Sequence, residues 1–232
     1  MSNENEEKRK KTPITRKRKI AIAIVITVAL IGFIAFVVVV ITGQSNDIFF
    51  SNGGKYDSTQ LNNMGVIYAN SSDIHAFTEG YSETTACPWG FVHNGIDYLF
   101  TNGSSYLAAA PGNVISVQIN DFGNATDNRY RVAINIRFNA SIVLLYNLEP
   151  WTNSTTNRDY VVSQIQVKVG DWVVKGQTLG TFVGYSDGGH VHFGVLVDGN
   201  AHCPQPYFGA SDLTELMTMI HSYHPTWNLC YT

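Results

Sequence analysis

The pattern of apolar and polar positions divides the chain into one long apolar run and a later region of short alternating segments. From Ile20 to Ile41 every side chain is apolar except Thr27. Farther along, apolar and polar residues alternate in short stretches that are broken by glycine and asparagine, which is typical of strands joined by tight turns. The clearest of these stretches are 114–119, 130–138, 141–146 and 190–197. The pattern therefore predicts a mainly β domain after the apolar run.

The apolar run predicts a transmembrane helix. An α-helix rises about 1.5 Å per residue, so about 20 apolar residues span the roughly 30 Å hydrocarbon core of a bilayer. The apolar core of a cleavable signal peptide is shorter, about 7–15 residues, and small residues follow it at the cleavage site. Here Val37 to Val40 continue directly into Ile41. We expect residues 20–41 to form a retained signal-anchor helix, with a cleaved secretory signal as the alternative.

Charge on either side of this run predicts its orientation. Residues 1–19 contain eight of the 15 Lys and Arg residues and only three acidic ones. Basic residues in a short flank of a transmembrane segment stay in the cytoplasm. We therefore expect a single-pass cell-membrane protein with a cytoplasmic tail at 1–19. A stalk rich in Gly, Ser and Asn would follow at 42–65, and an extracytoplasmic domain at 66–232.

The composition of the outer part favours an extracellular location and argues against nucleic acid as a partner. After residue 41 the chain carries seven basic and 15 acidic side chains, a net charge of −8, which repels phosphate backbones. The same part holds acceptor patterns for N-glycosylation, which suggest a glycoprotein. These patterns begin at Asn70, Asn102, Asn124, Asn139 and Asn153.

The cysteines also lie in the outer part, where a disulfide can persist. Cys87, Cys203 and Cys230 allow three different pairings. We favour the pair Cys203–Cys230, because it would hold the C-terminal segment against the domain.

Two further segments have recognisable local patterns. In 167–180, short β-branched runs are broken by Gly170-Asp171 and Gly176-Gln177, which predicts tight turns between strands. The one helix that the pattern predicts within 66–232 is 211–223, where Ser211 is the expected N-cap and the apolar residues share a face.

Two histidine-containing stretches carry the candidate chemistry. In a strand, side chains two residues apart point to the same face, so His190 and His192 emerge side by side from 190–197. His93 and Asp97 stand four residues apart, and Asn94-Gly95 between them favours a turn over a helix. If these stretches meet, two imidazoles and one carboxylate form an accepted three-ligand zinc site with a fourth position open for water.

Together these motifs resemble the lysostaphin/LytM-type zinc metalloendopeptidases. His93 to Asp97 is similar to the His-x-Gly-Ile-Asp of that family, and Ala110 to Ile115 is similar to its Ala-x-Gly-x-Val strand. The segment 167–180 resembles the family's Gly-rich hairpin, and His190-Val191-His192 resembles its His-x-His. The resemblance covers roughly residues 89–208, in the order of the family.

The resemblance implies a fold, a cofactor and an activity. The fold would be two packed antiparallel sheets with a groove between them (a barrel-sandwich, or duplicated hybrid motif), with one C-terminal helix. His93, Asp97 and His192 would bind Zn²⁺, and His190 would move the proton of the attacking water. The substrate would be a peptide of the bacterial cell wall or another extracellular peptide.

One position departs from the family. A second catalytic histidine of the family falls on Asn147 in this chain. Asparagine donates a hydrogen bond but cannot move a proton, so metal binding should survive this difference even if catalysis does not. Glu149 is a candidate to replace the lost acid. Trp89 and Trp151 are candidates to line a groove, although such aromatic residues more often belong to a core.

Two alternatives to an active peptidase remain open from the sequence. The first is a catalytically impaired, zinc-containing binding or scaffold module of the same fold, which Asn147 favours. The second is a lipoyl- or biotinyl-carrier domain, which the segment 167–180 also resembles. Carrier domains present a modifiable lysine at a hairpin tip, but Lys168 and Lys175 lack the flanking residues that such domains use.

Overall fold

The computed structural model describes residues 59–123 and 127–232. The expected cytoplasmic tail (1–19), the expected transmembrane helix (20–41) and most of the expected stalk (42–65) lie outside the described residues. Within the described ranges, no helix has both the length and the apolar character needed to cross a bilayer. The packed core reaches back to Leu61 and Met64, ahead of Val66, the first residue of the domain that we expected.

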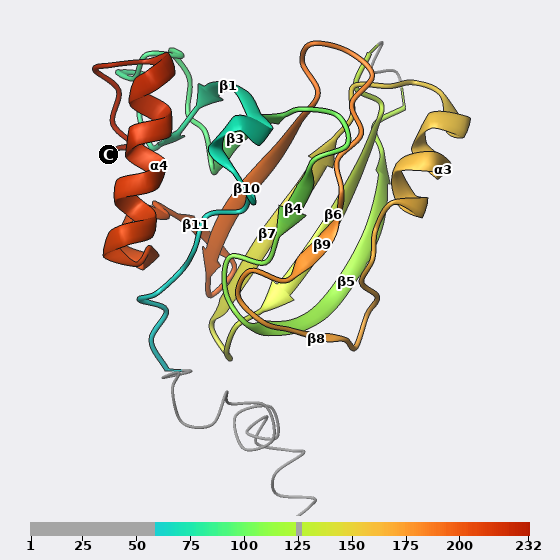
Figure 1. Cartoon of the computed structure of the whole chain (residues 1–232), viewed down its shortest axis with the longest axis horizontal. Helices are drawn as coiled ribbons and strands as arrows, with labels where there is room; N and C mark the ends of the chain where they lie inside the picture. The colour runs from blue at the N-terminus through green and yellow to red at the C-terminus, as the bar shows by residue number, and fades with distance from the viewer. Residues whose placement is uncertain (1–58, 124–126) are drawn as a thin grey trace, which may run out of the picture. The chain divides into compact units, whose positions relative to one another are not determined.

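An eight-stranded sheet is the main element of the described region (Figure 1). Its strands pair antiparallel in the order β1-β3-β10-β7-β6-β5-β8, and β11 pairs with the end of β10. These strands are β1 (Ile74–Glu79), β3 (Ile96–Phe100), β5 (Gly112–Asp121), β6 (Tyr130–Arg137), β7 (Ile142–Glu149), β8 (Trp172–Val173), β10 (His190–Val197) and β11 (Asn200–His202). The alternating stretches of the sequence correspond to β5, β6, β7 and β10.

Two short sheets accompany the large one. β4 (Ser105–Leu107) pairs antiparallel with β9 (Thr178–Thr181), and β2 (Tyr81–Ser82) pairs parallel with β12 (Cys230–Tyr231). Tyr106 of β4 and Leu179 of β9 belong to the same hydrophobic core as the large sheet. The prediction of a mainly β fold is therefore confirmed. The expected pair of antiparallel sheets takes an unequal form, because the sheet opposite the large one has only two strands.

The segment 167–180 contains the predicted turns but is not a hairpin. Gly170 and Gly176 have φ angles of 94° and 80°, a region that glycine enters without steric cost. However, β8 pairs with β5, and β9 pairs with β4. The two strands thus join different sheets, and neither Lys168 nor Lys175 stands at the tip of a paired hairpin.

Alternation along the strands gives the large sheet two unlike faces. Val191 and Phe193 of β10 and Tyr146 of β7 are buried in the core. Their removal from water, with that of the other apolar residues on this face, is the main force that holds the sheet against β4 and β9. The residues that alternate with these along the strands, including His190 and His192, point to the opposite face of the sheet.

The described residues contain two α-helices, where the sequence predicted one. α4 (Ala210–Tyr223) matches the predicted helix, but its N-cap is Gly209, so Ser211 lies inside the first turn and does not cap it. α3 (Thr155–Ser163) was not predicted; it begins after Ser154, whose side chain accepts a hydrogen bond from Asn157 N. The remaining short elements are the 3₁₀ turns η1 (Ser71–Asp73) and η2 (Gln205–Tyr207).

A disulfide fixes the C-terminal end of the domain. Cys203 and Cys230 are bonded, with their Cα atoms 5.9 Å apart, and Cys87 is a free cysteine. The favoured pairing is therefore confirmed. Because Cys230 begins β12, the bond holds that strand next to β2, close to the segment that contains His93.

Candidate metal centre

Asp97 and His192 lie opposite each other on neighbouring strands. The antiparallel register of β3 and β10 pairs the two residues directly. Directly paired residues point to the same face of a sheet, with their Cβ atoms about 5 Å apart. Here the side chains touch, since His192 Nδ1 is 2.8 Å from Asp97 Oδ1.

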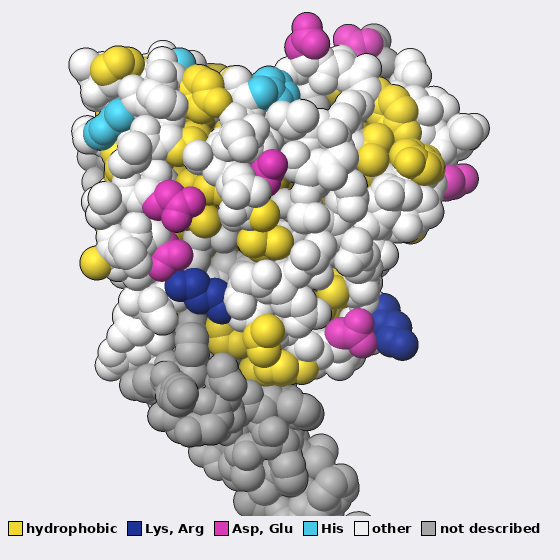
Figure 2. Space-filling model, viewed as in Figure 1, with side chains coloured by type: hydrophobic (Ala, Val, Ile, Leu, Met, Phe, Trp, Pro, Cys, Tyr) yellow, Lys and Arg dark blue, Asp and Glu magenta, His cyan; other side chains and the backbone are white. Residues whose placement is uncertain are grey.

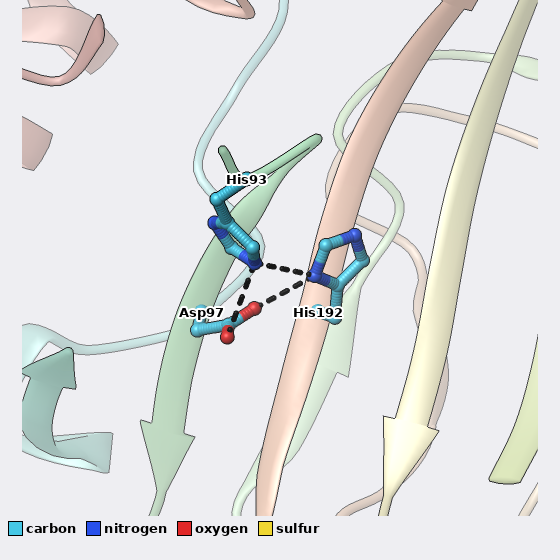
Figure 3. A group of neighbouring side chains, drawn as sticks. All are labelled: His93, Asp97 and His192. Carbon is cyan, nitrogen blue, oxygen red and sulfur yellow. Dashed lines mark hydrogen bonds and ion pairs between the residues drawn. The ribbon is translucent and has the colours of Figure 1, made fainter. Parts of the chain in front are cut away.

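His93 reaches the same place from the segment before β3. Two backbone hydrogen bonds join His93 to Ser82 of β2, and a bend at Asn94-Gly95 leads the chain into β3. His93 Nε2 lies 3.1 Å from His192 Nδ1 and 3.3 Å from Asp97 Oδ2. The three predicted ligands therefore converge, as Figure 3 shows, and their ligand atoms all lie within 4.8 Å of one another.

Gly95 is necessary for this convergence. A Cβ atom on Gly95 would lie 2.5 Å from His192 Nε2 and 2.6 Å from the carbonyl oxygen of Phe193. Both distances are shorter than atoms tolerate, and one of them involves backbone. The glycine of the His-x-Gly-Ile-Asp pattern thus serves the packing of His192 as well as the bend.

The backbone orients the His93 ring for metal binding. His93 Nδ1 is 2.8 Å from the carbonyl oxygen of Gly80. A carbonyl oxygen only accepts hydrogen bonds, so Nδ1 carries a hydrogen and Nε2 is the nitrogen that can bind a metal. Metal-binding histidines are commonly held in this way by a group outside the ligand set.

The charges of the cluster are those that a divalent cation requires. Burial acts to raise the pKa of Asp97, but hydrogen bonds from His192 and His93 outweigh it and hold the pKa well below its usual range. Burial acts to lower the pKa of His93, whereas the hydrogen bond and the charge of Asp97 outweigh this and raise it. The cluster thus favours the charged form of the carboxylate, and a cation bound there would compete with protons for the imidazole nitrogens.

Glu79 is an acidic neighbour of this centre that sequence reasoning missed. The register of β1 and β3 pairs Glu79 with Asp97. Burial, together with the charge of Asp97 beside it, raises the pKa of the Glu79 carboxyl. No spacing in the sequence signals this neighbour, because the pairing of β1 with β3 alone brings it there.

His190 stands beside the ligand set, on the same face of β10 as His192. Its Nδ1 is 2.8 Å from the carbonyl oxygen of Gly188, so Nδ1 carries the hydrogen and Nε2 has the lone pair. Nε2 lies 3.5 Å from Asp97 Oδ2 and 3.7 Å from Glu149 Oε2. His190 is therefore close enough to serve a molecule bound at the centre without being one of the three ligands.

β7 brings Asn147 and Glu149 to the same face. The register pairs Asn147 with His192 and Glu149 with His190. Asn147 thus lies beside the centre, where its amide offers only hydrogen bonds. Glu149 is 6% exposed; Arg131 Nη1 lies 3.1 Å from its Oε1, and Asn128 Nδ2 donates to its Oε2 at 2.7 Å. Both oxygens of the candidate acid are therefore already engaged.

The donor set fits Zn²⁺. Two imidazole nitrogens and one carboxylate oxygen are the ligands of catalytic zinc sites, whereas Ca²⁺ and Mg²⁺ prefer oxygen ligands alone. Among the described residues, His93, Asp97 and His192 form the one group with this geometry. The hydrogen bond that holds the His93 ring to Gly80 O also matches a metal site.

The other candidates from the sequence lie apart from the ligands. Trp89 is structural, because its Nε1 donates to Ser82 Oγ and its ring packs against Trp227 and Tyr231. Trp151 is 37% exposed and packs next to Gly188. Lys175 Nζ forms an ion pair with Asp212 at 3.0 Å, which removes one candidate for a carrier lysine.

A cavity of about 650 Å³ opens next to the loop that leads into His190. It is lined by Phe100, Asn102 and Phe182 together with loop residues up to Gly189, and it contains none of the three ligands. Loop residues 184–187 and Gly189, just before His190, form part of its wall.

Comparisons with known proteins identify similar solved structures only. No family model and no curated relative matches the sequence. A zinc-containing peptidase from Vibrio cholerae is 23% identical, with a TM-score of 0.41 over 60% of this chain. The catalytic domain of the antimicrobial peptidase lysostaphin from Staphylococcus simulans is 21% identical, with a TM-score of 0.39 over 59% of this chain and 93% of that domain.

A third similar structure is the SpoIIQ–SpoIIIAH pore-forming complex, which is 18% identical with a TM-score of 0.46 over 68% of this chain and 98% of that chain. This chain spans 38% of the length of the Vibrio cholerae peptidase. Lysostaphin is also one of the names of the family that the sequence motifs resemble.

Proposed function

We propose that the domain is a zinc metalloendopeptidase that cleaves peptide bonds in a cell-wall or other extracellular peptide. One observation carries this proposal: His93, Asp97 and His192, from two distant stretches of the chain, meet in one cluster beside His190. A structural zinc site would use four protein ligands, whereas three leave a position for water.

The described side chains fit the steps of peptide hydrolysis. When bound, zinc would supply Lewis-acid chemistry. It would polarise the substrate carbonyl and lower the pKa of water, so that water could give up a proton and attack near neutral pH. His190 Nε2 accepts the proton of the attacking water, because Nδ1 already donates to Gly188 O. The water oxygen bonds to the carbonyl carbon, the carbon–nitrogen bond breaks, and Nε2 returns the proton to the leaving amine.

Asn147 favours a second candidate function. Its neutral amide lies opposite His192, where the related enzymes are expected to carry a second histidine. Loss of one proton-transferring group typically costs about 10²–10⁴ in rate. The second candidate is therefore a zinc-containing binding or scaffold module in which the metal is retained and cleavage is not.

The location proposed for this function is the outer side of the cell membrane, with the N-terminus in the cytoplasm. The apolar run 20–41, its basic flank and the acceptor patterns for glycosylation support this orientation. The disulfide Cys203–Cys230 fits an oxidising compartment. Acidic side chains are scattered over the face of the domain in Figure 2, where basic ones are sparse, which disfavours nucleic acid as a partner. Protease digestion of intact cells tests the location, because only an outside domain would be degraded.

The metal and the activity are tested together on the full-length protein in detergent. The measurements are zinc content and cleavage of two probes, a fluorogenic pentaglycine peptide and cross-linked muropeptides. We expect one zinc per chain and cleavage in the wild type, and neither in His192→Ala. His202→Ala, which changes an exposed histidine of β11, should behave as the wild type.

The outcomes separate the two candidates. Zinc bound equally by the wild type and by His192→Ala would refute the proposed metal centre. One zinc per chain without cleavage, unchanged in Asn147→His, would favour the binding module over the enzyme. Cleavage that appears or rises strongly in Asn147→His would show that the centre is a peptidase weakened at this position.

A further inference from the structure

Trp151, two residues after Glu149 of β7, has an unusual backbone conformation. Its φ angle is 53°, in the left-handed region that bulky L-residues rarely occupy. The other non-glycine residue with a positive φ among those described is Asp198, in the Asp198-Gly199 turn, where such angles are common. Trp151 is outside any such turn, so its strain needs another explanation.

Hydrogen bonds on both sides hold Trp151 in this conformation. The carbonyl oxygen of Pro150 accepts from Tyr185 N at 2.8 Å, which joins the end of β7 to the loop 184–189. The carbonyl oxygen of Thr152 accepts from Arg129 N at 3.2 Å, and Thr152 is itself buried. The backbone therefore stays strained because both neighbours are anchored.

The strained backbone places the indole ring against Gly188. A Cβ atom on Gly188 would lie 2.7 Å from Trp151 Cε2 and 2.8 Å from Cδ2, so the ring packs directly on the glycine backbone. The carbonyl oxygen of the same Gly188 accepts the hydrogen bond from His190 Nδ1 at 2.8 Å. A continuous set of contacts thus leads from the Trp151 ring through one carbonyl group to the histidine beside the metal ligands.

We propose that Trp151 is a positioning residue: its ring holds the Gly188 carbonyl in place, and that carbonyl orients His190 with Nε2 toward the metal centre. The proposal rests on the proposed function for its consequence in catalysis, but the orientation of His190 is a property of the folded domain alone. This role explains why a tryptophan occupies a left-handed position and remains 37% exposed. Glycine would relieve the backbone strain at this position, and a tryptophan that served only the core would have its ring buried.

The test compares four variants of the full-length protein. Trp151→Gly removes the ring and relieves the backbone strain, and Trp151→Phe retains an aromatic ring. Gly188→Ala inserts a methyl group between residue 188 and the Trp151 ring. Tyr160→Ala, which removes an exposed aromatic residue of α3, is the control. The readouts are thermal stability, zinc content, the ¹⁵N signals of the His190 ring, and kcat and KM for the pentaglycine or muropeptide probe that the wild type cleaves.

We expect the His190 signals of the wild type and of Trp151→Phe to show one ring form with hydrogen on Nδ1. In Trp151→Gly and Gly188→Ala these signals should broaden or change, while zinc content stays the same. kcat should fall by roughly 10- to 100-fold with little change in KM, since a misplaced catalytic group costs about this much. The melting temperature of Trp151→Gly should not fall below that of the wild type.

A purely structural role for Trp151 predicts the opposite pattern. If Trp151→Gly lowers the melting temperature and leaves the His190 signals and kcat unchanged, the proposal is wrong. If neither the wild type nor Asn147→His cleaves either probe, the proposed function fails, and the His190 signals still decide whether Trp151 orients the ring.

Discussion

Gly95 is the residue on which the geometry of the metal centre depends most directly. In Gly95→Ala the added methyl group would collide with the His192 ring and with the Phe193 carbonyl. We expect zinc affinity to fall roughly 10- to 100-fold, as for other changes that displace a ligand. The free energy of unfolding should fall by about 1–3 kcal/mol, because the backbone must shift. Chelator competition and denaturant unfolding measure the two effects.

Gly194→Ala is the matched control. A Cβ atom on Gly194 would lie 3.4 Å from Asn94 O, an ordinary contact. Gly194 lies on the same strand as His192, and the Gly194→Ala variant should bind zinc as the wild type does. Equal zinc affinity in Gly95→Ala and Gly194→Ala would contradict the role given to Gly95.

The protonation of His93 predicts how zinc affinity depends on pH. Its pKa is raised from 6.5 in the metal-free domain, so a proton occupies the ligand atom up to a higher pH than in a free histidine. Zinc must displace that proton, and its apparent affinity should drop by roughly tenfold per pH unit below this pKa. Above the pKa, affinity should level off. Competition with a chelator of known affinity between about pH 5.5 and 8 measures the curve, and an affinity independent of pH would contradict this prediction.

At the level of elements, the side-chain amide of Asn102 holds the first residue of the loop 184–189. Asn102 Nδ2 donates to Gly184 O at 2.9 Å, and Asn102 Oδ1 accepts from Gly184 N at 2.6 Å. Asn102→Ala removes both bonds and should lower the free energy of unfolding by about 1–2 kcal/mol. The amide protons of 184–189 should exchange faster, with zinc affinity unchanged, since none of the ligands lies on this loop.

Thr101→Ala serves as the neighbouring control for the loop, because Thr101 is exposed and the hydrogen bond that its backbone nitrogen donates to Asp73 O does not involve the side chain. Hydrogen exchange that is equally fast in both variants would show that the Asn102 amide does not hold the loop.

The elements also show which local patterns are informative. α4 was predicted because its apolar residues share one face, and Leu216, Met219 and Ile220 are buried there. α3 was missed because its sequence has no apolar face, and Val161 is the only one of its residues that is buried. Periodicity reports burial, so a helix that buries almost nothing leaves no periodic signal.

At the level of the whole molecule, the disulfide Cys203–Cys230 closes a loop of 27 residues around α4. Replacement of both cysteines by serine should lower the free energy of unfolding by about 2–4 kcal/mol, mainly because the unfolded chain becomes less restricted. Denaturant unfolding measures the change. Reduction of the wild-type protein should have the same effect, and Cys87→Ser should have almost none, because Cys87 forms no disulfide. Equal stability of the wild type and the double variant would contradict the prediction.

The sequence alone determined the strands β5, β6, β7 and β10 and the candidate ligands. These features follow from alternation and from short motifs, which express the local preference of each segment to bury one face. His93 and Asp97 could be chosen because, together with His190-x-His192, they can form a zinc ligand set and resemble the motifs of the lysostaphin/LytM-type family.

The tertiary structure decided which segments meet. The pairing of β3 with β10 placed Asp97 against His192, and the pairing of β1 with β3 brought Glu79 to the same centre. The left-handed backbone of Trp151 and its contact with Gly188 likewise have no signature in the sequence. Register and contacts between distant segments depend on the packing of the whole core, so no local pattern contains them.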